Sequence, residues 1–225
     1  MPTGRQLISD VRSLDKLLSA DSSITDRAIY RELRSTTNLL IKRETNLRRL
    51  WNTPNIFTLL KCMKMEAVPL SECCDYQSNI KVARSIKEIP QISEGIFGLL
   101  IQTVYSPGLT KFDYSAIDRF VNLLKLNIKN TKKYFWVYGN KLYVSNPDIE
   151  NIEMSAYFDE DIRPEDYTDC VPKIETCINP LDRDFKIPSY LEKNIKDMVH
   201  ETLMKTYFRH VEDKSPDAND TEITR

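Results

Sequence analysis

The clearest local signal in the chain is a predicted β-hairpin. Two β-rich runs, Tyr134–Tyr138 and Lys141–Ser145, flank the two-residue turn Gly139-Asn140. A turn of this composition matches the right-handed twist of paired strands, so the two runs are expected to pair antiparallel. Residues 149–158 follow with apolar and polar side chains in alternation, which predicts a further strand. The fold is therefore expected to contain a small antiparallel sheet.

Two more strands and one helix are predicted ahead of this hairpin. Residues 59–68 mix apolar and polar residues in a strand-like alternation that ends at Pro69, and residues 99–105 are rich in β-formers. The segment between 71 and 91 suits short strands and loops. Residues 114–128 return to a helical period, with their apolar side chains on one side. A helix is therefore expected among the strands.

Helices are also predicted at both ends of the chain. Residues 4–20 place apolar side chains at three- and four-residue steps, which is typical of a short amphipathic helix. A second helix is expected to begin at a cap formed by Ser23 or Thr25, and its apolar stripe continues to Asn52, where Pro54 marks the boundary. At about 1.5 Å per residue it would be roughly 40 Å long, longer than a small core requires. Much of its length is therefore available to a partner chain. Residues 188–210 predict the last helix.

These elements predict an α+β fold with an N-terminal helical hairpin that contains a long helix, a small antiparallel β-sheet with an inserted helix, an extended arm and a C-terminal helix. Prolines interrupt the arm, where one short helical turn is expected at Pro164–Tyr167. The predicted regions are the helical residues 1–54, the α+β core 55–162, the arm 163–187, the C-terminal helix 188–211 and a disordered tail 212–225.

The composition is that of a globular protein without a general attraction to polyanions. The 225 residues are 41% hydrophobic, and 32 Lys and Arg against 33 Asp and Glu give a net charge of −1. No broad affinity for DNA or anionic lipid is therefore expected. Neither a signal peptide nor an apolar stretch of membrane-helix length is recognisable. The protein is expected to be made in the cytosol, with free thiols at its five cysteines, Cys62, Cys73, Cys74, Cys170 and Cys177.

The sequence offers no recognisable catalytic constellation. His200 and His210 are ten residues apart on the last predicted helix and do not share a face, so surface or interface roles are favoured over catalysis. The cysteine spacings do not fit paired zinc ligands, although a site assembled across the fold is an alternative. Five glycines, among them Gly95 and Gly98, provide no phosphate-binding loop. No enzyme activity, cofactor or metal is predicted.

Acidic residues gather in the loop 159–166, as Asp159–Asp161 and Glu165-Asp166. Their carboxylates suit a hard cation such as Ca²⁺ or Mg²⁺, but the spacing matches no EF-hand loop. A solvated acidic surface is the simpler interpretation.

The aromatic residues of the hairpin, Tyr134–Tyr138 with Tyr143, allow two interpretations. They resemble a platform on which bases could stack, yet strand alternation divides them between two faces of the sheet. Core packing and subunit contact explain them more simply.

Basic residues cluster on the long predicted helix. The cluster consists of Arg27, Arg31, Arg34, Lys42, Arg43, Arg48 and Arg49, with Glu32 and Glu44 as partial counterweights. One interpretation is a basic stripe that faces DNA or an acidic neighbouring subunit. The other is the solvated face of an amphipathic helix with ordinary pairing between residues four apart. The sequence leaves both open, and the second is the simpler.

Two stretches of the chain resemble virion structural proteins of crAss-like phages, short-tailed viruses of gut Bacteroidetes. The first stretch contains Ile24–Tyr30, Leu39–Glu44, Trp51 and the predicted strand 59–68. The second contains the hairpin around Lys141–Val144, Met154–Asp159 and Arg163–Tyr167. Together they extend over residues 5–175 and include no catalytic motif.

This resemblance implies a ring or adaptor subunit in the head-to-tail connector of the virion. It implies a ring of identical subunits, expected to be a dodecamer, which is stacked between portal and tail, surrounds the DNA channel and is assembled in the host cytoplasm. The implied partners are copies of the chain, the portal, other neck and tail proteins and, nonspecifically, packaged DNA; no membrane is implied. A terminal arm would contact a neighbouring ring, and its candidate contact residues are Arg163, Tyr167, Tyr190 and Tyr207.

The alternative is a cytosolic DNA-binding or regulatory protein that uses the basic helix 27–49. Such a protein would bind DNA in a salt-dependent manner as an isolated monomer or dimer. A neck subunit should show little of this affinity.

Overall fold

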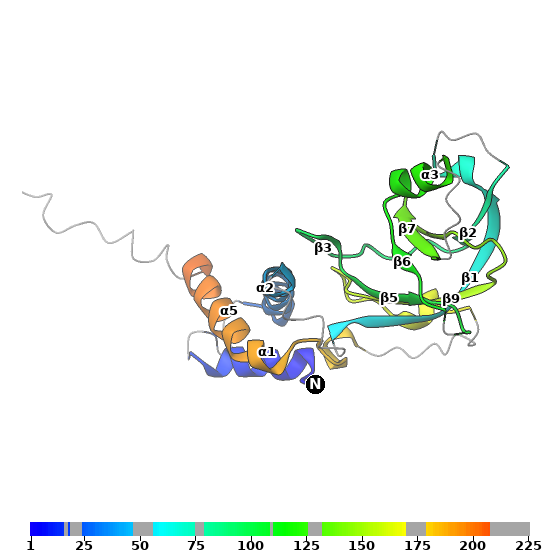
Figure 1. Ribbon diagram of the computed structural model, residues 1–225. Coiled ribbons are helices and arrows are strands. Elements are labelled where there is room, and N and C mark those ends of the chain that lie inside the picture. The colour runs from blue at the N-terminus through cyan, green and yellow to red at the C-terminus, as the bar shows by residue number, and fades with distance from the viewer. Residues whose placement is uncertain are drawn as a thin grey trace, which may run out of the picture. The chain divides into compact units, whose positions relative to one another are not determined.

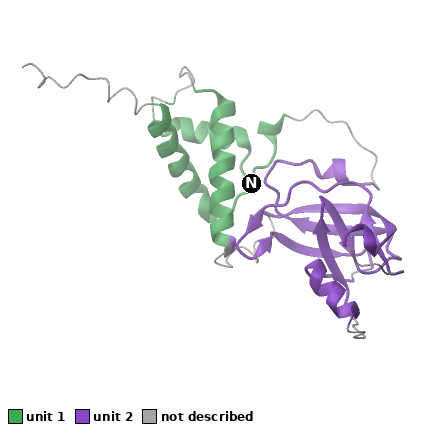
Figure 2. Ribbon diagram, turned by 90° about the horizontal axis from the view of Figure 1, so that it is seen from above, with its two compact units in different colours: residues 1–44, 178–225 green, residues 45–177 purple. Residues whose placement is uncertain are grey.

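The computed structural model describes residues 1–15, 18, 24–46, 56–74, 79–108, 110–125, 132–169 and 179–207. The chain divides into two compact units (Figure 2). Unit 1 comprises Met1–Glu44 together with Ile178–Arg225, and unit 2 comprises Thr45–Cys177. The first and last parts of the chain therefore belong to one unit, and the middle forms the other.

Within the described residues, unit 1 contains the α-helices α1 (Gly4–Ser13) and α5 (Glu192–Tyr207) and all but the last two residues of α2 (Asp26–Asn46) (Figure 1). Each helix contributes one apolar stripe to a shared core, whose buried residues include Leu7, Val11, Ile29, Leu33, Ile195 and Val199. The predicted N-terminal helical hairpin is thus only part of a larger helical core that the C-terminal helix completes. The predicted continuation of α2 beyond Asn46 lies outside the described residues.

The first helix is shorter than the predicted helix 4–20. Leu14, which the periodicity placed inside the helix, is already its C-cap. Arg12 explains the early end, because its guanidinium donates to the carbonyl oxygens of Leu18 and Ile24, at 2.9 and 2.8 Å. It also pairs with the carboxylate of Asp26 at 2.7 Å. These bonds place Leu18 and Ile24 beside the last turn of α1, and a helix that continued to residue 20 could not place Leu18 there.

The end of the predicted arm packs within unit 1. The backbone N–H of Phe185 donates to the carbonyl oxygen of Pro2 at 2.8 Å, and the side chains of Phe185 and Ile187 are buried in the helical core. The 3₁₀ helices η4 (Pro180–Asp182) and η5 (Ser189–Leu191) flank this stretch. The last third of the predicted arm is therefore extended but attached to the helices.

A seven-stranded sheet with the order β5-β9-β1-β2-β8-β7-β6 forms the centre of unit 2. The strands are β1 (Thr58–Pro69), β2 (Lys81–Ser85), β5 (Ile101–Tyr105), β6 (Asp113–Tyr114), β7 (Tyr134–Tyr138), β8 (Lys141–Val144) and β9 (Asn151–Ala156). Neighbouring strands are antiparallel except for β6 and β7. The fold is α+β as predicted, but the sheet is large where a small one was expected.

The sheet is larger than expected because β1 pairs with two strands in succession. Its residues Thr58–Lys64 pair with β9, and its residues Met65–Pro69 pair with β2. The register shifts between Leu60 and Met63, where Cys62 has a φ of 52°. An irregularity of this kind bends a strand, so one long strand can serve both halves of a curved sheet.

The curvature brings the two edges of the sheet toward each other (Figure 1). In the connection between the edge strands β5 and β6, the N–H of Phe112 donates to the carbonyl oxygen of Val104 at 2.9 Å, and Tyr105 forms a bridge with Lys111. The nearly closed sheet surrounds an apolar core whose buried members include Leu60, Val104, Leu142, Val144, Ile152 and Met154.

The outer face of the sheet carries a second apolar cluster beneath helix α3 (Ile117–Lys125). Phe120 of α3 stacks on Trp136 with 4.9 Å between ring centroids, and Trp136 lies parallel to Tyr143 at 6.0 Å. The helix predicted over 114–128 is confirmed in type, although residues 126–131 lie outside the described residues.

The predicted hairpin is confirmed in detail. β7 and β8 pair from Phe135 with Val144 to Tyr138 with Lys141. Gly139 and Asn140 have φ values of 54° and 61°, the left-handed conformation that the sequence pattern requires of both turn residues.

A second, much smaller hairpin was not predicted. It consists of β3 (Glu94–Gly95) and β4 (Gly98–Leu99), with Ile96 and Phe97 at its tip. Gly98 has a φ of 102°, which only glycine adopts readily, and this explains the residue at that position.

The helices of the described part of the chain are too short or too polar for any of them to span a membrane. The expectation of five free thiols is wrong at Cys62, which is disulfide-bonded. Cys73 and Cys74 are free, and Cys170 and Cys177 lie outside the described residues. The cellular compartment predicts whether cysteines are in general reduced or oxidised. Whether one particular cysteine forms a disulfide depends on whether the fold brings a second cysteine within bonding distance.

Candidate interaction surfaces

The exposed side of α2 carries a row of residues that we call the α2 ridge: Arg27, Arg31, Ser35, Leu39 and Arg43. The row recurs every four residues, so each member lies about one helical turn from the next. All five side chains are exposed, and Leu39 is 61% exposed. The opposite side of the helix, with Ile29 and Leu33, is in the core. The ridge is therefore a basic surface with an apolar residue within it.

The other predicted basic residues take different positions. Arg34 is half-buried, and its guanidinium carbon lies 5.9 Å from the ring centroid of Phe185, which makes it part of a cation–π contact in unit 1. Lys42 is half-buried beside the ridge. Arg48 and Arg49 lie outside the described residues. The structure thus brings Arg27, Arg31 and Arg43 together on one exposed row and gives Arg34 a packing role.

The candidate arm residues are dispersed over the two units. Arg163 is exposed at the start of α4 (Pro164–Tyr167), the helical turn that the sequence predicted. Tyr167 packs against the core of the sheet in its own unit. Tyr190 and Tyr207 are exposed, at the start and the end of α5. Three of the four side chains are therefore accessible to a partner, and Tyr167 is largely used within unit 2.

A cation holds the segment after α4 on the sheet. The ammonium of Lys87 lies 2.6 Å from the carboxylate of Asp169 and donates to the carbonyl oxygens of Asp166 and Thr168. Asp169 also accepts the N–H of Lys64 at 3.1 Å. Burial by itself raises the pKa of Asp169, but these hydrogen bonds and the positive charges of the two lysines outweigh it, so the pKa lies below its ordinary value.

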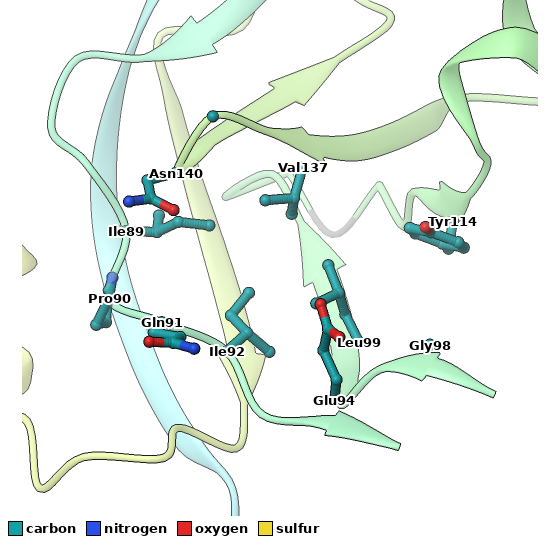
Figure 3. Close-up of a pocket in the computed structure, with 11 residues that line it drawn as sticks. Ile89, Pro90, Gln91, Ile92, Glu94, Gly98, Leu99, Tyr114, Val137 and Asn140 are labelled. Atoms are coloured by element: carbon teal, nitrogen blue, oxygen red, sulfur yellow. The ribbon is translucent and has the colours of Figure 1, made fainter. Parts of the chain in front are cut away.

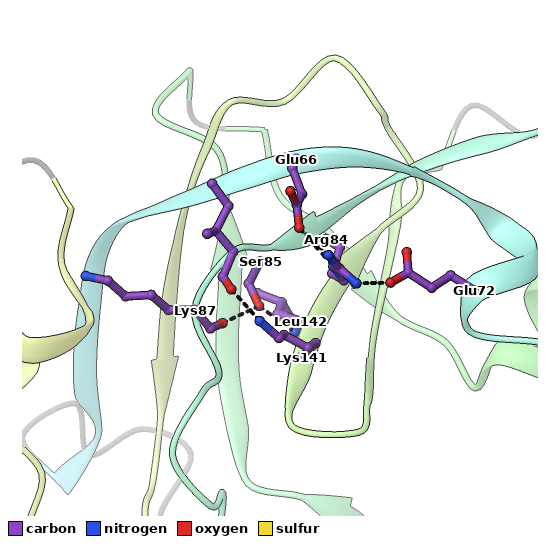
Figure 4. Close-up of polar contacts among 8 residues, drawn as sticks. Glu66, Glu72, Arg84, Ser85, Lys87, Lys141 and Leu142 are labelled. Atoms are coloured by element: carbon purple, nitrogen blue, oxygen red, sulfur yellow. Dashed lines mark hydrogen bonds and ion pairs between the residues drawn. The ribbon is translucent and has the colours of Figure 1, made fainter.

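A second polar network fixes β2 on its neighbours (Figure 4). Arg84 forms ion pairs with Glu66 of β1 and with Glu72. The hydroxyl of Ser85 accepts the N–H of Leu142 at 3.1 Å and donates to the carbonyl oxygen of Lys87 at 2.8 Å. These groups satisfy one another, so the network stabilises the sheet and contains no reactive group.

A hollow of about 700 Å³ lies at the base of the β3–β4 hairpin (Figure 3). Its apolar walls include Ile89, Ile92, Leu99 and Val137. The polar side chains that line it are Glu94, Gln91, Asn140 and Tyr114. One carboxylate, two amides and a phenol provide no nucleophile paired with a base, so the hollow suits binding of an apolar group better than catalysis.

The tip of the β3–β4 hairpin is the most exposed apolar feature of the described residues. Ile96 is 80% exposed and Phe97 is 66% exposed. Glu94, at the base of the same hairpin, is also exposed. A turn that must face only solvent does not require two large apolar side chains, so this tip is a candidate contact.

The histidines, acidic residues and cysteines of the described residues do not form a reactive site. His200 on α5 has Nε2 3.7 Å from the carboxylate of Asp15, and His210 lies outside the described residues. In the part of the chain that the structure describes, no three His, Cys, Asp or Glu side chains are grouped so as to hold a metal ion, the acidic loop 159–166 included. Burial raises the pKa of Cys73 to about 11, so this thiol is a poor nucleophile at neutral pH.

The sequence model of the phage tail ring protein 2 family matches residues 6–222, nearly the whole chain. The chain belongs to this family of crAss-like phage tail ring proteins. Membership gives it a structural role in the virion, in a class of proteins that is generally not enzymatic, and the resemblance seen in the sequence is confirmed. A ring protein also associates with copies of itself. No curated protein matches the chain.

Two features of the ring protein's surface are not among the predictions from the sequence. Gly95 and Gly98 form no phosphate-binding loop, but the two large apolar residues between them are a signal for an exposed hairpin tip. Leu39 falls outside the apolar stripe of α2, so its exposure follows from the helical period.

Proposed function

We propose that the chain is a ring or adaptor subunit of the head-to-tail connector, where twelve copies join the portal to the tail and surround the DNA channel. It is assembled in the host cytoplasm, remains in the virion neck or tail, and lines the route of genome ejection. The observation that carries this proposal is the match to a tail ring family over residues 6–222.

The surfaces of the molecule support the proposal. A subunit in a closed ring needs two different surfaces, one for each neighbour. The chain has an exposed α2 ridge in unit 1 and an exposed hairpin tip in unit 2. The portal or another ring would be contacted from the segment 163–187 and α5, through Arg163, Tyr190 and Tyr207, all of which are exposed. Tyr167 would stabilise the base of that contact.

Mass measurement and negative-stain imaging of the purified protein, alone and mixed with the portal of the same phage, test this function. We expect closed rings of twelve copies, in isolation or on the portal. A protein that stays monomeric at every concentration and joins neither portal nor virions would overturn the proposal. Strong, salt-dependent binding of the monomer to DNA would support the DNA-binding alternative instead.

A further inference from the structure

We propose that the α2 ridge of one copy docks on the tip of the β3–β4 hairpin of a second copy, with Leu39 packed against Ile96 and Phe97. The inference rests on the proposed ring function and adds the pair of surfaces that would join neighbouring copies. The first surface lies in unit 1 and the second in unit 2.

The hairpin tip has the properties of an inserted apolar knob. Ile96 and Phe97 are adjacent, belong to a two-residue turn, and are 80% and 66% exposed. The hairpin holds its shape through the pairing of Glu94 with Leu99 and of Gly95 with Gly98. Neither apolar side chain at the tip belongs to a buried cluster of the sheet. At these exposed fractions both side chains are accessible to a second copy.

The α2 ridge offers a matching surface. Leu39 is 61% exposed, and the small side chain of Ser35 lies one turn before it, which leaves space for a large apolar group beside the leucine. Arg43 lies one turn after Leu39, about 6 Å along the helix axis, and Arg31 lies about 12 Å before it. The ridge is thus an apolar centre between two cations.

The charges of the two surfaces are complementary. Glu94 is the first residue of β3 and Ile96 is the first residue of the turn, so at most about 7 Å separates their Cα atoms. This spacing is close to that between Leu39 and Arg43 on the helix. When the apolar groups meet, the Glu94 carboxylate can lie beside the guanidinium of Arg43. Opposite charges at matched distances fix the register of such a contact and disfavour wrong partners.

A protein partner explains the ridge better than DNA does. Phosphates are contacted by cations and hydrogen-bond donors, and an exposed leucine in the same row contributes to neither. Leu39 does fit an interface whose centre is apolar and whose rim is charged. Each copy carries one α2 ridge and one hairpin tip. Among copies of the same chain, every ridge can therefore be paired with the hairpin tip of another copy. Such a head-to-tail contact closes into a ring when the rotation that relates one copy to the next is 360° divided by a whole number.

Charge reversal and mixing test the contact. Arg43→Glu alone and Glu94→Arg alone should each lower the fraction of protein in rings at least tenfold, measured by mass and negative stain under conditions in which the wild-type protein forms rings. An equal mixture of the two variants should restore rings, because every contact in an alternating ring then joins opposite charges. Leu39→Asp and Phe97→Asp should each abolish rings while circular dichroism stays unchanged.

Matched controls and contrary outcomes are available within the same chain. Lys81→Glu in β2 and Glu150→Arg before β9 reverse exposed charges that belong to none of the proposed contact surfaces, and they should leave ring formation unchanged. Rings formed at wild-type levels by Arg43→Glu or Glu94→Arg overturn the inference but not the ring function. Rescue in a double variant of one chain, without rescue in the mixture, places the contact within a single copy and also overturns it. A wild-type protein without rings overturns both proposals, and a loss of DNA binding alone in Arg43→Glu assigns the ridge to DNA.

Discussion

The ammonium group of Lys87 lies 2.6 Å from the carboxylate of Asp169, and the same carboxylate accepts the N–H of Lys64. The lysine follows β2, whereas Asp169 is the last described residue of the predicted arm before the segment 170–178. This pair therefore fixes the end of the described segment that follows α4 against the sheet of unit 2.

Asp169→Asn is expected to destabilise unit 2 in a pH-dependent way. The pKa of Asp169 is lower in the folded protein than the ordinary value of about 3.9, so its stabilisation is complete above that value and is lost as the pH falls through the folded-state pKa. At pH 7 the substitution should lower the free energy of unfolding by about 1 kcal/mol. Urea titrations of both proteins should show this difference shrinking below pH 4. The exposed Asp148, changed to Asn, should have no effect at either pH, and a pH-independent loss for Asp169→Asn would contradict the assignment.

Gly139→Ala should weaken the hairpin between β7 and β8. Gly139 has a φ of 54°, where a Cβ atom is strained, so we expect the free energy of unfolding to fall by about 1 to 2 kcal/mol. Gly108 lies in a different turn, has open space around it and does not have a positive φ. Gly108→Ala should therefore change the stability by less than about 0.5 kcal/mol. Equal losses for the two substitutions, measured by thermal or urea unfolding, would be incompatible with the turn conformation described here.

The parts of the fold that were predicted best are those in which a local backbone conformation requires particular residue types. The turn at Gly139-Asn140 needs two residues that tolerate positive φ, and few other dipeptides meet this need. The helical turn at Pro164–Tyr167 follows from a proline at its first position. The basic character of the exposed side of α2 also follows from its period, because Arg27 and Arg31 lie opposite the apolar stripe.

Long-range relationships account for what the sequence did not show. The size of the sheet depends on β1 changing partner from β9 to β2 near Met65, and no local pattern specifies that change. The early end of α1 depends on Arg12 reaching Ile24, and the packing of Tyr167 depends on the sheet beneath it. The disulfide at Cys62 likewise depends on which chain segments the fold brings together.

Arg12→Lys should destabilise unit 1, although it keeps the charge. The guanidinium of Arg12 is only 15% exposed and joins two carbonyl oxygens and the carboxylate of Asp26. A lysine ammonium is a point charge and cannot reproduce this planar arrangement of donors, so two bonds or more are lost. We expect the free energy of unfolding to fall by about 1 to 3 kcal/mol. Arg27→Lys on the α2 ridge is the control, since Arg27 is exposed and the substitution should be neutral in urea unfolding.

Cys73 should react slowly with iodoacetamide in the folded protein. Burial raises its pKa from about 9 to about 11, an effect that the nearby Trp136 indole opposes only in part, and the residue is 3% exposed. At pH 8 the thiolate fraction is therefore about a hundredfold smaller than in the unfolded chain, and the reaction rate should fall at least as much because the thiolate is the nucleophile. Timed labelling followed by peptide mass spectrometry separates Cys73 from the half-buried Cys74, which should react faster in the same sample. Rates for Cys73 that agree within tenfold in native and urea-unfolded protein would show that the cluster beneath α3 is open to solvent.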